Sequence, residues 1–108
     1  MKRRLDVTPQ ARRDMAAILD WYRENLGARA ALKVAHTIRS RLKALEAGRV
    51  RGAELVAESR YMRIVAKSHI VIFLSEADAI KIVRIVHGAQ DLEAIATDLE
   101  ADQQGRTS

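Results

Sequence analysis

The 108-residue chain contains no cysteine, which excludes disulfide cross-links and cysteine-based metal sites. No stretch approaches the roughly 20 uncharged apolar residues that a transmembrane helix requires. The basic N-terminus, Met1–Arg4, is not followed by an uninterrupted apolar signal region, so we expect no export. These absences predict a cytoplasmic protein without a membrane anchor.

Several motifs that mark enzymes and metalloproteins are also missing. The sequence shows no glycine-rich phosphate loop, nucleophile elbow or carboxylate pair. His36, His69 and His87 are far apart and form no local ligand set such as HExxH. We therefore expect no metal and no cofactor. Because the chain has neither repeats nor linkers, we predict one domain over residues 1–100 and a polar, frayed tail over residues 101–108.

The charge is positive overall but unevenly distributed. The net charge is +5, and residues 1–63 hold 15 Lys/Arg against 7 Asp/Glu, whereas residues 64–108 hold 4 against 7. A basic half favours a polyanionic or acidic partner, such as nucleic acid, the ribosome or an acidic protein segment. The alternative is that the charge only keeps a small domain soluble.

The first half of the chain has the pattern of a strand followed by two helices. Arg3–Val7 is predicted as a short strand, and Thr8 with Pro9 supplies an N-cap and a first helical residue. Glycines at 27 and 48 are predicted to end the two helices. Each helix has one apolar stripe, formed by Ala11, Met15, Ile18, Leu19, Tyr22 and Leu26 and by Ala31, Val34, Ala35, Ile38, Leu42 and Leu45. The short connection predicts an antiparallel helical hairpin.

Gly48–Ser59 is predicted as an exposed loop with a brief ordered turn around Glu54–Ala57. Three β-type runs follow, at Tyr61–Ala66, His69–Leu74 and Ile80–Val86. The third run has branched residues on both faces, which is typical of a strand covered on both sides.

The helical hairpin is predicted to cover one face of this sheet. The other face is predicted to be covered by a last helix, which Asp91 caps, and by a segment of a partner protein. The order β-α-α-β-β-β-α predicts an α+β fold in which an N-terminal antiparallel helical hairpin packs on a small, mostly antiparallel sheet.

Four parts of the sequence together resemble a known family. They are Val7–Ala11 with Asp14, Met15 and Ile18; Asn25–Gly27 with Ala30 and Ala31; Arg60–Val65 with His69–Phe73; and Ile82–Gly88 with Asp91. With these residues the chain resembles the RelE/ParE superfamily of type II toxin–antitoxin toxins. The resemblance is greatest to the ParE branch, also labelled plasmid stabilisation proteins.

The resemblance implies a partner and a choice of targets. Such toxins are neutralised by a cognate antitoxin, whose extended, acidic C-terminal segment wraps the toxin. ParE-type toxins trap DNA gyrase with cleaved DNA, whereas RelE-type toxins cut mRNA in the ribosomal A site. Three hypotheses follow: a ParE-like gyrase inhibitor without chemistry of its own, a RelE-like endoribonuclease, and a non-toxic relative that only binds an antitoxin.

The endoribonuclease hypothesis assigns catalytic roles to three residues. His87 would act as general acid or base, and Arg63 and Arg84 would cradle a phosphate. Alternatively, His87 hydrogen-bonds the turn and the two arginines are surface ion-pair partners. Tyr61 could serve as an acid or pack on the sheet. Ribosome-directed relatives often have a terminal aromatic or basic residue here, but an acidic helix follows Gly88, so we favour gyrase.

Eight residues are predicted to bind the target or the antitoxin: Arg13, Trp21, Arg60, Tyr61, Arg63, Arg84, His87 and Asp91. Trp21 falls at the margin of its apolar stripe, where it could anchor a partner or lie at the rim of the core. The basic positions of the two helices are Arg12, Arg13 and Arg23 and Arg39, Arg41 and Lys43. They form either a polyanion-binding surface or solvated faces, and any nucleic-acid contact is expected to be indirect.

Overall fold

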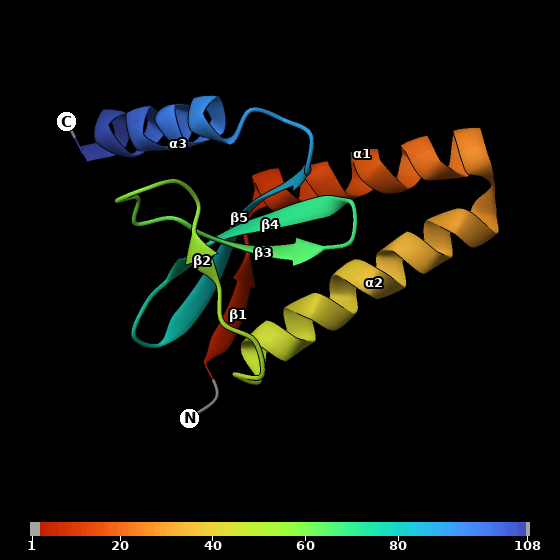
Figure 1. The fold of residues 1–108 in the computed structure, drawn as a ribbon, viewed down its shortest axis with the longest axis horizontal. Helices are drawn as coiled ribbons and strands as arrows, with labels where there is room; N and C mark the ends of the chain where they lie inside the picture. Colours follow the sequence, from red (N-terminus) through yellow and green to blue (C-terminus); the bar gives the residue numbers. More distant parts are fainter. Residues whose placement is uncertain (1–2, 108) are drawn as a thin grey trace.

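The computed structural model describes residues 3–107, with side chains through residue 102. Met1, Lys2 and Ser108 of the predicted domain and tail lie outside the described residues. The elements are β1 (Arg4–Val7), α1 (Pro9–Leu26), α2 (Ala28–Glu46), β2 (Ala53–Glu54), β3 (Met62–Ala66), β4 (His69–Ser75), β5 (Ala79–His87) and α3 (Leu92–Thr107). Figure 1 shows α3 on one side of the sheet and the α1–α2 hairpin reaching out from the other.

The strands form one sheet in the order β1-β5-β4-β3-β2. Only β1 and β5 are parallel, and the other three pairs are antiparallel. This arrangement confirms the predicted α+β class and mostly antiparallel sheet. The loop predicted after Gly48 is wrong in part, because Ala53 and Glu54 form the extra strand β2 opposite Arg63 and Met62. Two paired residues are too few to show a periodic pattern.

The helical hairpin forms as predicted and covers one face of the sheet. Thr8 Oγ1 accepts a hydrogen bond from Ala11 N at 3.2 Å, and Pro9 opens α1. The chain reverses at Gly27, whose φ of 94° is accessible at little cost only to glycine. The residues buried between the hairpin and the sheet include Ala11, Ile38, Leu42, Leu45, Ile64, Val71, Phe73, Ile80, Ile82 and Ile85.

Helix α3 covers the second face of the sheet. Asp91 Oδ1 accepts hydrogen bonds from the backbone N–H groups of Glu93 and Ala94, at 3.0 and 3.2 Å, as an N-cap does. The apolar side of α3 packs on the sheet through Leu92, Ile95, Ala96 and Leu99, against Leu55, Tyr61, Ile70, Ile72 and Val86. Both faces of β5 are therefore covered, as its sequence predicts.

The helical backbone of α3 continues to Thr107, beyond residue 100, the predicted end of the domain. Neither proline nor glycine occurs from Leu92 to Gln104, so nothing local stops the helix at residue 101. Fraying of this segment stays a prediction. None of the helices among the described residues is long and apolar enough to cross a membrane.

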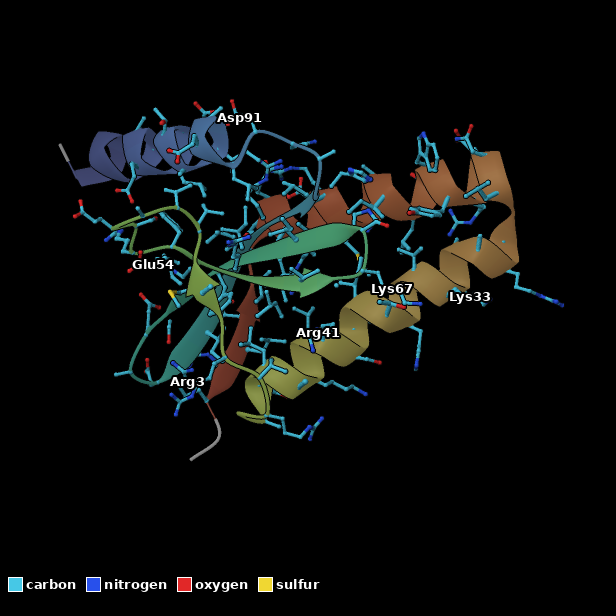
Figure 2. All side chains as sticks on the ribbon, in the orientation of Figure 1. Arg3, Lys33, Arg41, Glu54, Lys67 and Asp91 are labelled. Carbon is cyan, nitrogen blue, oxygen red and sulfur yellow. The ribbon has the colours of Figure 1, made fainter. Side chains whose placement is uncertain are left out.

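The open edge of β3 is covered by a side chain. Beyond the short β2, the carbonyl of Val65 accepts a hydrogen bond from Arg41 Nε at 2.9 Å. Figure 2 shows Arg41 on α2, from which it reaches this edge. A charged side chain at a strand edge opposes pairing with another chain.

Candidate functional site

A groove of about 650 Å³ opens between the start of α1, the strands β4 and β5, and the middle of α3. Its polar lining mixes four cations with three acids: Arg13, Arg60, Lys81 and Arg84 with Glu76, Asp98 and Asp102. Tyr61, Val83 and Leu99 provide an apolar floor. A groove with an apolar floor and a charged rim suits an extended or helical peptide.

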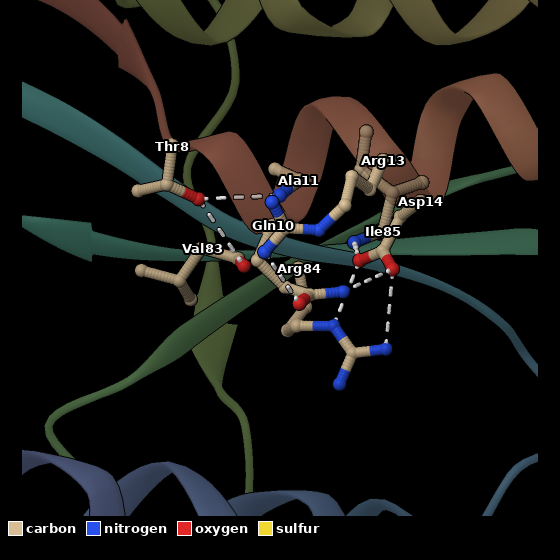
Figure 3. Close-up of polar contacts among 8 residues, drawn as sticks. All are labelled: Thr8, Gln10, Ala11, Arg13, Asp14, Val83, Arg84 and Ile85. Atoms are coloured by element: carbon tan, nitrogen blue, oxygen red, sulfur yellow. Dashed lines mark hydrogen bonds and ion pairs between the residues drawn. The ribbon is translucent and has the colours of Figure 1, made fainter.

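One side of the groove is fixed by an ion pair between α1 and β5 (Figure 3). Strand β1 ends at Val7, so the second half of β5 has no neighbouring strand there. Asp14 Oδ2 accepts the free N–H of Ile85 at 2.9 Å. Arg84 holds the same carboxylate at two points, with Nε 2.7 Å from Oδ2 and Nη2 3.2 Å from Oδ1. The guanidinium of Arg84 therefore forms an ion pair within the protein, which agrees with the alternative that Arg84 is an ion-pair partner.

The other side of the groove is formed by the residues just before β3 and by α3. Tyr61 is only 3% exposed, and its hydroxyl donates to the carbonyl of Leu99 at 3.4 Å. The Arg60 guanidinium lies 5.6 Å from the centre of the Tyr61 ring and 3.9 Å from Glu100 Oε1. Across the groove, Arg13 donates to Gln10 Oε1 on the exposed surface of α1. Thus the groove brings together four of the eight predicted residues.

The remaining predicted residues lie outside the groove. Arg63 Nε donates to the carbonyl of Glu54 at 3.1 Å and so holds β2 against the sheet. Asp91 caps α3. Trp21 is 55% exposed on α1, with its ring edge against Tyr22 at 5.2 Å between centroids.

His87 belongs to a separate ring cluster at the other end of β5. It lies directly opposite His69 in the β4–β5 pair, with ring centroids 5.6 Å apart, and Tyr22 is 5.9 Å from His69. His69 is 5% exposed. Burial, followed by repulsion from His87, lowers the pKa of His69 below its ordinary value of 6.5. His87 is exposed, and its Nδ1 accepts the N–H of Ala89 at 3.1 Å.

The strand register separates His87 from the two arginines. Directly opposite residues in an antiparallel pair share a face, so the pairs Arg63–Ile72 and Ile72–Arg84 place both arginines on the α3 face. His87 shares the hairpin face with His69, which contacts Tyr22 of α1. Among the described residues, no group of three or more metal-binding side chains gathers in one place.

Sequence reasoning missed several residues of these sites. Lys81, Asp98 and Asp102 line the groove, but only the fold brings them near Arg13. Lys81, like Arg84, is a cation in a mostly apolar strand, and this was the available signal. His69 was noted only as a strand residue, and its position opposite His87 depends on the register of the hairpin.

The family model described as ParE toxin of type II toxin-antitoxin system, parDE, matches residues 5–92. The fold is similar to a chain of the chromosomal ParDE system from P. aeruginosa, with a TM-score of 0.69 and 24% identity over 80% of this chain and 96% of that one. It is also similar to a chain of the RelBE2 toxin–antitoxin complex from Mycobacterium tuberculosis, with a TM-score of 0.58 and 18% identity over 81% and 99%. No curated protein sequence gives a significant match. Because the family model covers most of its length, the chain belongs to the ParE toxin family of type II toxin–antitoxin systems.

Proposed function

We propose that this protein is a ParE-like toxin that inhibits DNA gyrase by protein contact in the bacterial cytoplasm and is neutralised by a cognate antitoxin. Membership of the ParE family supports the proposal. The mixed-charge groove between α1, β5 and α3 is our proposed seat for the antitoxin's C-terminal segment. Its apolar floor at Tyr61, Val83 and Leu99 can bury apolar anchors, and Arg13 and Arg60 at its rim can meet acidic side chains.

One observation favours gyrase inhibition over RNA cleavage. Metal-free cleavage of RNA needs an acid, a base and cationic support around one phosphate. Here His87 lies on one face of the sheet and Arg63 and Arg84 on the other. Arg84 is also engaged with Asp14, and Arg63 with Glu54. The three side chains of the endoribonuclease hypothesis therefore do not converge on a common point.

A gyrase assay tests the proposal directly. Purified toxin is added to DNA gyrase with relaxed plasmid, and both supercoiling and cleaved DNA are measured. We expect supercoiling to fall and cleaved DNA to accumulate, and prior addition of the antitoxin should prevent both effects. Unchanged supercoiling without cleaved DNA contradicts the proposal.

Two further measurements separate the alternatives. Toeprinting on translating ribosomes detects A-site cuts, and cuts that disappear in His87→Ala would support the endoribonuclease. Harmless expression of the toxin alone in a bacterium would instead support a non-toxic antitoxin-binding relative. The antitoxin itself is expected from the neighbouring gene, as a small acidic protein with a DNA-binding N-terminal part.

A further inference from the structure

The outer face of α2 has basic side chains and no acidic ones. No Asp or Glu occurs from Asn25 to Leu45. Arg29, Lys33, His36 and Lys43 are exposed and recur at intervals that place them on one side of a helix. With a rise of 1.5 Å per residue, the row from Arg29 to Lys43 is about 21 Å long. Within the described side chains, none of these three Arg and Lys residues forms an ion pair.

A small pocket adjoins this row. It has a volume of about 120 Å³ and lies between α2 and the turn that joins β3 to β4. Its lining residues include Lys33, Lys67, Thr37 and Ser68, and none of them is acidic. Figure 2 labels Lys67 and Lys33, which line this pocket from the turn and from α2. Two cations and two hydroxyl donors around one cavity suit a single tetrahedral anion.

Lys67 adopts an unfavourable backbone conformation at this pocket. Its φ is 56°, in the left-handed region that glycine and asparagine adopt more readily than lysine. A role for its ammonium group in binding an anion gives a physical reason for lysine at this position.

We propose that the α2 row and the adjoining pocket bind the sugar–phosphate backbone of double-stranded DNA, with one phosphate seated between Lys33 and Lys67. An acidic protein segment would also need several apolar anchors, but within the described part of α2 the only exposed large apolar side chain beside the row is Leu32. Single-stranded nucleic acid is usually held by aromatic stacking, but α2 has no Trp, Tyr or Phe, and Tyr22 at the pocket is already packed against the rings of Trp21 and His69. The contact belongs to the toxin itself and does not depend on gyrase.

Fluorescence anisotropy with the full chain and a labelled duplex of arbitrary sequence tests this proposal. Affinity should fall steeply between about 50 and 200 mM salt, with a log–log slope of about −0.9 for each phosphate contacted. The double variant Lys33→Gln/Lys67→Gln should weaken binding at least tenfold and make the slope less steep by about 2. The control Arg12→Gln/Arg23→Gln removes the same charge from α1 and should change affinity less than threefold.

A second variant separates binding from folding. Lys67→Gly relieves the backbone conformation of the turn and removes the ammonium group. We expect its melting temperature to equal or exceed that of the natural chain while its affinity for the duplex falls several-fold. Equal losses in the α1 control would overturn the proposal, since net charge alone would then explain binding. A further outcome is that single-stranded DNA or polyglutamate binds as tightly as the duplex and loses this binding in the same Lys33/Lys67 variant. That result would overturn the assignment of this face to double-stranded DNA.

Discussion

Asp14 of α1 and Arg84 of β5 are 70 residues apart in the sequence and form a two-point ion pair, at 2.7 and 3.2 Å. The Asp14 side chain is 9% exposed and that of Arg84 is 31% exposed. The same carboxylate accepts the N–H of Ile85, for which β1 offers no partner. A helix side chain thus completes the edge of the sheet at the point where the parallel strand ends.

Replacement of Asp14 by alanine should lower the free energy of unfolding by about 2–3 kcal/mol, because it leaves a strand N–H and a partly buried guanidinium without their acceptor. Asp14→Asn keeps one acceptor oxygen and should cost roughly half as much. Urea unfolding followed by circular dichroism measures both. Asp20→Ala is the control, since the Asp20–Arg23 pair is exposed and its loss should cost less than about 0.5 kcal/mol. Equal effects at positions 14 and 20 would contradict the assigned role.

The buried His69 should make folding stability depend on pH. Its pKa is lowered in the folded protein, by burial first and by His87 second, so the unfolded chain binds the proton more readily. Stability is therefore complete above the unfolded pKa of about 6.5 and falls as the pH drops below it toward the lower folded value. The melting temperature is measured from about pH 7.5 to about pH 5, a range that spans the unfolded pKa. Over this range it should decrease less in His69→Phe than in the natural chain. His36→Gln, which alters an exposed histidine, should keep the natural profile.

Gly52 has no space for a side chain. A Cβ built there would lie 2.5 Å from Cζ of Phe73 and 3.0 Å from the carbonyl oxygen of Arg63, and Phe73 is 2% exposed. Gly52→Ala should therefore lower the free energy of unfolding by about 1–3 kcal/mol. The same substitution in a Phe73→Leu background should cost less, because the ring that it meets is gone. If the effects of Gly52→Ala and Phe73→Leu on thermal unfolding simply add, the Phe73 ring is not the cause of the destabilisation by Gly52→Ala.

Most of the fold could be predicted because its signals are local. Thr8, Pro9 and Gly27 mark the hairpin, and the apolar strand of Ile80–Val86 indicates two covered faces. The groove could not be predicted, since it depends on how α3 crosses the sheet and brings Leu99 to Tyr61. The roles of Arg84 and His87 likewise depend on register, which a bulge between Ile72 and Phe73 shifts. Sequence patterns identify polar residues in a strand, but not which long-range partner each one meets.

The groove should bind the antitoxin through its rim charges. Among the described residues, the Arg13 side chain hydrogen-bonds only Gln10. Arg60 is about half exposed, with Glu100 at 3.9 Å and the centre of the Tyr61 ring at 5.6 Å, so its reversal gives up two contacts at the rim, and the melting temperature of each variant checks that folding is kept. Arg13→Glu/Arg60→Glu should weaken antitoxin binding by about ten- to a hundredfold, with most of the effect from like-charge repulsion against an acidic segment. Titration calorimetry with the neighbouring gene's acidic product measures the loss, which should shrink at high salt.

The matched control for that experiment is Arg12→Glu/Arg23→Glu, which reverses two charges on α1 outside the groove. If the antitoxin lies in the groove, the control should reduce affinity far less than the Arg13/Arg60 pair, although both variants change the net charge equally. Similar losses of affinity in the two variants would show that antitoxin binding depends only on the overall charge of the toxin. No loss in either would place its binding surface elsewhere, because an acidic segment in this groove cannot avoid two reversed charges at its rim.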